Sequence, residues 1–151
     1  MTVASFWVAG DPKAQPRHRA FARGGNVRCY DPGTAEGWKA LIAAAARPHL
    51  PIVPLKGPVE VHIDFFFRRP KRLLRKRDPD RVMWYDRKPD RDNLAKAVLD
   101  ALTQIGFWFD DAQVCSGRVR KFYCAKLSVL RWSRPGARIS ILSLANSEAL
   151  P

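Results

Sequence analysis

The chain has 151 residues, which suffices for one domain with a hydrophobic core and is too short for two independent ones. It is 46% hydrophobic and 11% aromatic, and this composition excludes wholesale disorder although 27% of the residues are charged. Lys and Arg number 27 against 14 Asp and Glu, so the net charge is +13. This excess indicates a polyanionic partner, although a basic surface that only maintains solubility would also produce it.

The cysteines and the N-terminus bear on where the protein works. The three cysteines show no paired spacing, so the sequence predicts neither a disulfide framework nor a structural zinc site. No stretch approaches the roughly 20 apolar residues that span a bilayer, and the N-terminus lacks a secretory pattern. We therefore expect a cytoplasmic protein, with a nucleoid-associated or phage setting included, and no membrane partner.

The first half of the chain predicts a strand, a basic loop and a helix. Residues 5–9 form a short apolar run that ends in glycine and prolines, which is typical of a strand before a loop. The loop that follows is rich in Arg and is expected to form a hairpin or a lid. Residues 38–45 place apolar side chains at helical spacing after Thr34, a suitable N-cap, and Pro48 is expected to end this helix.

The second half predicts three strands and a second helix. Residues 59–67 alternate between apolar and polar, as in a strand with one buried face, and residues 113–123 and 137–144 also favour strands. Apolar residues from 94 to 105 repeat at helical spacing. Together these elements predict one α+β domain over residues 1–151, with a mixed β-sheet covered by two main helices.

Residues 68–89 break all periodicity and are expected to form a long basic loop. Eleven of the 27 basic residues lie between Arg68 and Arg91. Long loops in compact domains are usually functional or disordered, and positive charge concentrated in this way fits contacts with phosphates.

Two carboxylates, Asp90 and Asp92, flank Arg91 just before the second predicted helix. In an extended segment both side chains would lie on one side, about 7 Å apart at Cα. Two carboxylates this close repel each other unless a cation neutralises them, so a divalent ion such as Mg²⁺ or Mn²⁺ would explain the pair. Helix capping by Asp92 or Asn93 explains the same residues, and it is the favoured interpretation for this motif taken alone.

A second acidic pair, Asp110 and Asp111, follows the predicted helix, and the two pairs together suggest a metal cluster. Geometry imposes a condition, because a helix over residues 93–105 is roughly 20 Å long. The connection from Gly106 can retrace only about 17 Å when fully extended. Asp111 therefore meets the first acidic pair only if the chain turns straight back, or if it meets the pair of a second subunit.

The roles of three more side chains stay open on spacing alone. Lys96 lies four residues from both Asp92 and Asp100, so it is equally well interpreted as part of an exposed charge ladder or as a cation that faces a phosphate. Trp84 and Tyr85 stand among basic residues and could stack on unpaired bases, although ordinary partial burial is the favoured interpretation.

Three motifs in the order Lys88-Pro89-Asp90-x-Asp92-Asn93-Leu94-x-Lys96, Asp100-Ala101-Leu102 and Asp110-Asp111-Ala112-Gln113-Val114 resemble the core signature of the RusA family of Holliday-junction endonucleases. The resemblance implies a small homodimer of α+β subunits that cuts four-way DNA junctions symmetrically in a Mg²⁺-dependent reaction. It also implies that Asp90, Asp92 and Asp111 are the catalytic carboxylates and Lys96 the essential basic residue, with Asp110 and Asn93 in supporting positions. The chain departs from the family pattern at Arg91, where relatives commonly have an apolar residue, and in the length of the basic loop.

The functional hypothesis is hydrolysis of a DNA phosphodiester in recombination or repair. Asp90, Asp92 and Asp111 would hold one or two Mg²⁺ ions, with Mn²⁺ as the alternative and no small-molecule cofactor. The DNA is expected to contact basic residues of the two loops: Arg17, Arg19, Arg68, Arg69, Lys71, Arg72, Arg75, Lys76, Arg87 and Lys88. The competing hypotheses are a non-catalytic basic DNA-binding protein and a nuclease for flaps or other branched DNA.

Overall fold

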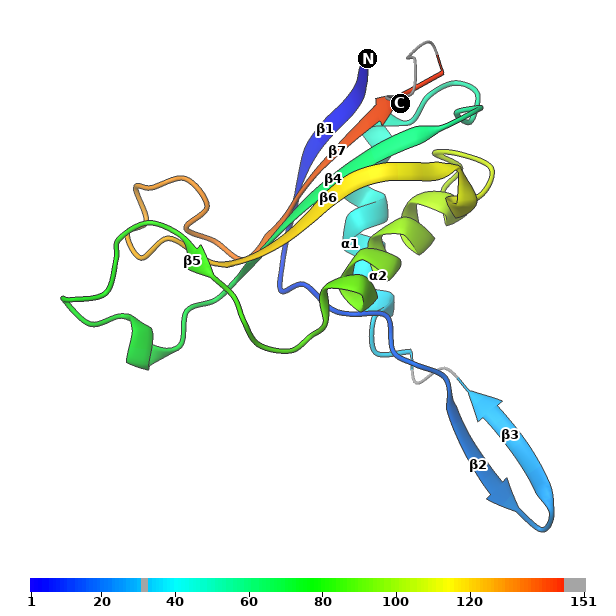
Figure 1. Cartoon of the computed structure of the whole chain (residues 1–151), viewed down its shortest axis with the longest axis horizontal. Coiled ribbons are helices and arrows are strands. Elements are labelled where there is room, and N and C mark those ends of the chain that lie inside the picture. Colours follow the sequence, from blue (N-terminus) through cyan, green and yellow to red (C-terminus); the bar gives the residue numbers. More distant parts are fainter. Residues whose placement is uncertain (31–32, 146–151) are drawn as a thin grey trace, which may run out of the picture.

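The computed structural model describes residues 1–30 and 33–145 and contains seven strands and two main helices in its described part (Figure 1). In chain order they are β1 (Thr2–Ala9), β2 (Arg19–Arg23), β3 (Asn26–Tyr30), α1 (Glu36–Ala46), β4 (Val59–Phe67), β5 (Met83–Trp84), α2 (Arg91–Gln104), β6 (Val114–Tyr123) and β7 (Gly136–Ser143). Single turns of 3₁₀ helix lie at Arg47–His49, Lys71–Leu73 and Asp111–Gln113.

Five of the strands form one mixed sheet in the order β1-β7-β4-β6-β5. The central strand β4 pairs in parallel with β6 and antiparallel with β7. The parallel pair exists because the chain crosses back through α2 between these two strands, and parallel neighbours need such a crossover. The predicted single α+β domain with a mixed sheet is confirmed.

Both main helices cover the same face of the sheet (Figure 1). Alternate residues of β4 from Val59 to Phe65 are buried in one core cluster, which also contains Ile42 of α1 and Val98 of α2. The alternation expected for residues 59–67 therefore marks the face that the helices cover. The opposite face of the sheet, called the far face below, carries a different set of side chains.

Two segments project from the domain. The β2–β3 hairpin extends away from the sheet (Figure 1), and the side chains of residues 19–29 are all exposed. Residues 68–89, called the excursion below, contain one 3₁₀ turn and the two-residue strand β5. The expected hairpin and the expected long basic loop are thus both present.

The helix starts differ from the predictions. The N-cap of α1 is Ala35 and not Thr34, and α2 begins at Arg91 instead of near Asn93. Hydrophobic periodicity placed the start of α2 two residues too far along the chain, because Arg91 and Asp92 in its first turn are exposed and add no apolar residue to the pattern. Among the described residues, no helix is both long and apolar enough to cross a membrane.

Candidate active site

The amino end of α2 carries the first predicted acidic pair. Asp90 occupies the N-cap position in extended conformation, whereas Asp92 lies in the first helical turn. The prediction that both carboxylates lie in an extended segment before the helix is therefore wrong for Asp92, because the helix begins between the two residues. The capping prediction is also wrong, since the N-cap is Asp90 and its side chain makes no capping hydrogen bond. Asp92 still lies near the positive end of the helix dipole, which favours an anion.

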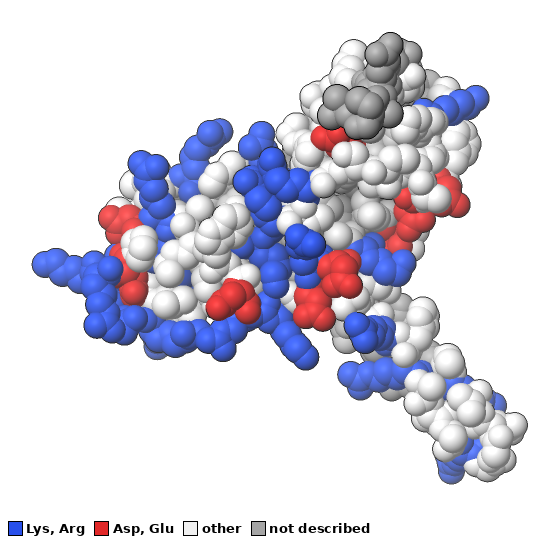
Figure 2. Space-filling view, viewed as in Figure 1, with Lys and Arg blue, Asp and Glu red and all other residues white. Residues whose placement is uncertain are grey.

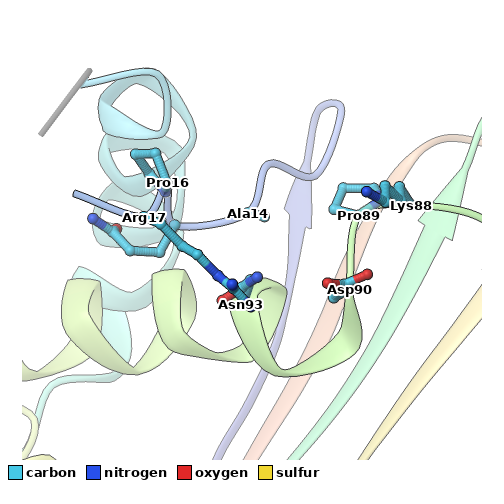
Figure 3. Close-up of a pocket in the computed structure, with 8 residues that line it drawn as sticks. Ala14, Pro16, Arg17, Lys88, Pro89, Asp90 and Asn93 are labelled. Carbon is cyan, nitrogen blue, oxygen red and sulfur yellow. The ribbon is translucent and has the colours of Figure 1, made fainter. Parts of the chain in front are cut away.

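An open hollow of about 640 Å³ lies beside this end of α2. Arg17, Lys88, Asp90 and Asn93 contribute to its wall, and Figure 3 shows Arg17 reaching toward Asn93 with Asp90 across from it. The backbone N–H of Gln15 donates to the carbonyl of Asn93 at 2.9 Å, which holds the N-terminal loop against the helix. The hollow thus combines a carboxylate with two cationic side chains.

Lys121 of β6 fastens the segment that leads into Asp90. Its ammonium donates to the carbonyls of Arg87 at 2.7 Å and Pro89 at 2.9 Å. The hydroxyl of Tyr85 donates to the carbonyl of Lys88, and burial raises the pKa of this phenol, which keeps it protonated as a donor. Lys121 could not be identified from the sequence, because no local pattern shows that a strand lysine contacts carbonyls more than thirty residues earlier.

The carboxyl end of α2 presents the second acidic pair on a 3₁₀ turn. Asp110 is the N-cap of this turn, and its carboxylate accepts from the N–H of Ala112 at 2.8 Å. The side-chain oxygen of Gln113 accepts from the N–H groups of Phe109 and Asp110 at 2.9 and 3.1 Å. The capping box thereby occupies Asp110 and leaves the carboxylate of Asp111 exposed at the start of the turn.

This turn is also tied to the body of the domain. The amide nitrogen of Gln113 donates to the carbonyls of Leu55 and Gly57, both at 2.9 Å. Just before the turn, Phe107 and Trp108 are buried. The position of Asp111 is therefore fixed by the fold and does not depend on a mobile loop.

The two acidic pairs do not meet within one chain. The 14 residues of α2 make it about 21 Å long, and Asp111 follows its far end. In the described part of the chain, no three His, Cys, Asp or Glu side chains lie close enough to hold a metal ion. The chain therefore does not fold back as one of the two expected arrangements requires.

The three predicted catalytic carboxylates also differ from most other acids in having no partner. Asp90, Asp92 and Asp111 are exposed, and they make no side-chain hydrogen bond or ion pair within residues 1–30 and 33–145. Most other carboxylates in the described part of the chain are engaged, as in the bidentate pair of Asp64 with Arg120. The hydrogen bond from Arg120 to Asp64 raises the pKa of the Arg120 guanidinium. Further engaged acids are Asp78 with Arg75, Asp80 with Lys126, Asp100 with Lys39 and Lys96, and the capping Asp110.

Lys96 lies between the two ends of the helix. Its ammonium pairs with Asp100 at 3.3 Å, and the buried Lys39 of α1 approaches the same carboxylate at 3.8 Å. The interpretation as a charge ladder therefore holds for Lys96 and Asp100, whereas no contact between Lys96 and Asp92 is seen among the described residues. The side chain of Lys96 is still 57% exposed, so a phosphate can reach it.

Arg69 must be withdrawn from the predicted DNA-binding surface. This residue is 6% exposed, and its guanidinium donates to the carbonyls of Cys124, Leu73 and Pro79 at 3.0, 3.1 and 2.7 Å and to that of Arg81. Sequence alone could not separate Arg69 from its basic neighbours. The other basic residues predicted in the excursion are exposed.

The hairpin offers two cations that the predicted set did not include. Register pairs Phe21 with Arg28 and Arg23 with Asn26, and these four side chains line a hollow of about 250 Å³. Arg19 lies on the same face because side chains alternate along a strand. In the sequence, Arg19, Phe21 and Arg23 occupy alternate positions, and this pattern could have indicated that they share one face of the hairpin.

Comparison with known proteins assigns the chain to a family. It matches the family model of endodeoxyribonuclease RusA over residues 9–130, a range that includes α2 and both of its ends. It is 33% identical over 128 residues to the uncharacterized protein YqaN of Bacillus subtilis (strain 168), covering 82% of this chain and 89% of that protein. It is 31% identical over 111 residues to the crossover junction endodeoxyribonuclease RusA of Escherichia coli (strain K12), covering 74% of this chain and 79% of that protein. The crossover junction endodeoxyribonuclease of Enterobacteria phage 82 has the same identity and coverage. The chain therefore belongs to the RusA family and is an endodeoxyribonuclease.

Proposed function

We propose that this endodeoxyribonuclease resolves Holliday junctions during DNA recombination or repair, in a Mg²⁺-dependent reaction and as a homodimer. The observation that carries the proposal is the set of exposed carboxylates Asp90, Asp92 and Asp111, which have no partner among the described residues of a chain of net charge +13. The relatives from Escherichia coli and phage 82 are named crossover junction endodeoxyribonucleases, which supports a four-way junction as the substrate. Family membership sets aside the non-catalytic DNA-binding alternative.

The donor atoms at the amino end of α2 fit a magnesium ion. Mg²⁺ usually takes one or two carboxylates together with water and substrate phosphates, and the exposed Asp90 and Asp92 offer hard oxygen donors of this kind. Mn²⁺ accepts the same ligands. When bound, the ion would neutralise charge on the phosphodiester and make a water molecule more acidic. Arg17 and Lys88 beside the hollow would bind the DNA backbone and hold the scissile strand in place.

A homodimer would bring the two ends of α2 together. A two-fold axis perpendicular to α2 places the amino end of one helix beside the carboxyl end of its partner, so Asp111 of one copy meets Asp90 and Asp92 of the other. An apolar groove of about 340 Å³ between α2 and β6 supports this face as the contact, with Leu99 and Val119 in its wall. Such a dimer has two equivalent sites, which suits symmetric cuts in two strands.

The DNA-binding surface would extend over both projecting segments. Figure 2 shows Lys and Arg side chains gathered over the excursion and along the hairpin, with acidic side chains between the two. To the predicted residues Arg17, Arg19, Arg68, Lys71, Arg72, Arg75, Lys76, Arg87 and Lys88 we add Arg23 and Arg28 of the hairpin. These side chains would contact phosphates, which set position and not sequence. Lys96 would offset phosphate charge near the cut.

The test is cleavage of a synthetic four-way junction, a flap and a linear duplex by the wild type and by Asp92→Asn in Mg²⁺. We expect the wild type to cut the junction preferentially and Asp92→Asn to lose at least about 100-fold in cleavage, because one ligand and its charge are removed. Junction binding by the variant in Ca²⁺ should stay within about twofold of wild type. Asp11→Asn is a matched control, since this exposed acid lies outside the site.

Equal cleavage of flap and junction by the wild type would favour the branched-DNA alternative. Wild-type activity in Asp92→Asn would refute the metal assignment.

A further inference from the structure

A row of aromatic rings crosses the far face of the sheet. Trp7 of β1 packs against Trp132 with ring centroids 5.5 Å apart, and Trp132 stacks on Phe66 of β4 at 5.0 Å. Phe66 stacks on Phe122 of β6 at 5.5 Å, and Phe122 stacks on Trp84 of β5 at 4.8 Å. We call these five residues the aromatic ladder. It runs from one edge strand of the sheet to the other.

The backbone is shaped to accommodate this ladder. A Cβ atom on Gly136 would lie 2.3 Å from the carbonyl oxygen of Val8 and 2.4 Å from the indole of Trp7, so only glycine lets β1 and the Trp7 ring approach β7 this closely. Trp132 has a φ of 63°, a left-handed conformation that bulky residues rarely adopt. The guanidinium groups of Arg131 and Arg138 lie 5.5 and 5.7 Å from its ring. Contacts on several sides therefore hold the indole in place, although the backbone of Trp132 adopts an unfavourable conformation.

The last ring of the ladder, Trp84, is open to solvent. It is 70% exposed although its indole stacks on Phe122 with an interplanar angle of 28°. The favoured prediction of partial burial is wrong for Trp84. It holds for its neighbour Tyr85, which stacks on Phe67 at 4.1 Å and is half-buried. An exposed ring that is oriented by stacking on a half-buried neighbour, here Phe122, is preorganised to receive another flat group.

The surroundings of Trp84 are cationic and close to the proposed site. Arg120 lies 5.2 Å over the Phe122 ring, although its guanidinium also forms the bidentate pair with Asp64. Arg87 is 63% exposed, although it also pairs with Asp86 at 3.7 Å. Asp90 is the sixth residue after Trp84, a span of roughly 20 Å when the chain is fully extended. This distance corresponds to about six nucleotides of a duplex strand at 3.4 Å each.

Resting on the proposed function, we propose that Trp84 is a stacking platform for an unpaired base of branched DNA near the crossover. A nucleobase has a flat π-face that stacks on an aromatic ring whatever its sequence, and the flanking Arg side chains suit the attached phosphates. A fully paired duplex keeps its bases stacked internally and offers none to the indole. Trp84 would thus favour branched over linear DNA without reading sequence.

The test uses the full-length protein in Ca²⁺, so that binding is measured without cleavage. The substrates are a four-way junction, a linear duplex and a duplex with one unpaired base, each carrying 2-aminopurine at the branch or bulge or at a paired control position. Trp84→Ala should bind the junction and the bulged duplex about 5- to 150-fold more weakly, as expected for the loss of one stack. Its affinity for linear duplex should stay within about twofold, because phosphate contacts remain.

Two further variants provide the controls. Trp84→Phe keeps a π-face and should retain most of the affinity and the 2-aminopurine fluorescence change at the branch. Leu74→Ala removes an exposed apolar side chain of the same excursion and should bind all three DNAs as the wild type does.

Unchanged junction binding by Trp84→Ala, or an equal loss on linear duplex, would overturn the platform. Dissociation of the dimer by this variant in sedimentation would also overturn it and assign Trp84 to a protein interface. If the wild type shows no preference for junctions, the proposed substrate fails. The platform would still stand if the bulged duplex gives a fluorescence change that depends on Trp84.

Discussion

The two ends of α2 are built in different ways. At the amino end, Asp90 is positioned by distant parts of the chain, namely Lys121 of β6 and the loop that contains Gln15. At the carboxyl end, Asp111 belongs to a capped turn whose main contacts come from Gln113, two residues away. The helix fixes the distance between the ends, so neither can move to the other. The proposed site, which joins Asp90 and Asp92 to Asp111, therefore requires a second copy of the chain.

The largest effect is expected when two inactive variants are mixed. Asp92→Asn and Asp111→Asn should each abolish cleavage when pure. After subunit exchange, half of the dimers contain one chain of each kind, and in these one of the two shared sites has all its carboxylates. A quarter of all sites are then complete, so the rate of nicking of a four-way junction should return to about a quarter of the wild-type rate. The measurement is single-strand nicking of a labelled junction before and after exchange.

The control mixture is Asp92→Asn with Asp90→Asn. Both changes affect the same end of α2, so no shared site is complete and nicking should stay absent. If the Asp92→Asn and Asp111→Asn mixture is also inactive although exchange is demonstrated, the three carboxylates act within one chain or in separate sites.

A smaller effect is expected from Gln113→Leu at the carboxyl end. This change removes the amide that bonds to Asp110, Phe109, Leu55 and Gly57, and the free energy of unfolding should fall by about 2 kcal/mol. Cleavage should fall roughly 10- to 100-fold because Asp111 is no longer held in place. Thermal unfolding and junction nicking measure the two effects. Gln104→Leu, on the exposed last turn of α2, should change neither, and an equal loss there would remove the positioning role.

The smallest effect is expected at the amino end from Lys121→Met. Loss of its bonds to the carbonyls of Arg87 and Pro89 should lower cleavage roughly threefold to tenfold, because Asp90 becomes less well positioned. Lys126→Met is a matched change, since that lysine also donates to two carbonyls of the excursion, those of Arg75 and Asp78. Equal rates for the two variants in a nicking assay would show that Lys121 acts through general stability alone.

Sequence patterns predicted the fold well and the site only in part. The alternation in residues 59–67 identified β4, and the apolar repeat identified α2, because both signals arise from burial on one face. The start of α2 was missed because its first turn is polar. The length of α2 could be calculated from its number of residues, and this length indicated that Asp111 reaches Asp90 of its own chain only if the chain turns straight back.

What the sequence could not show are contacts between distant residues. Arg69 and its exposed neighbours look alike in a basic run, and only folding places this one guanidinium among backbone carbonyls. Trp84 and Tyr85 are adjacent, yet one is exposed and the other stacks on Phe67, because they lie on opposite sides of the chain. Such differences depend on tertiary packing and leave no periodic signal.

The buried guanidinium of Arg69 has a consequence for how this surface can diversify. Because one interior cation bonds to carbonyls along the excursion, the loop's shape is specified from within and not by its exposed side chains. Substitutions on the outside can then alter which DNA is preferred without unfolding the loop. In the excursion, Arg69 sets the conformation of the loop, and the exposed side chains set the preference for DNA. Relatives that retain an arginine at this position could therefore share the loop conformation and differ in the DNA that they bind.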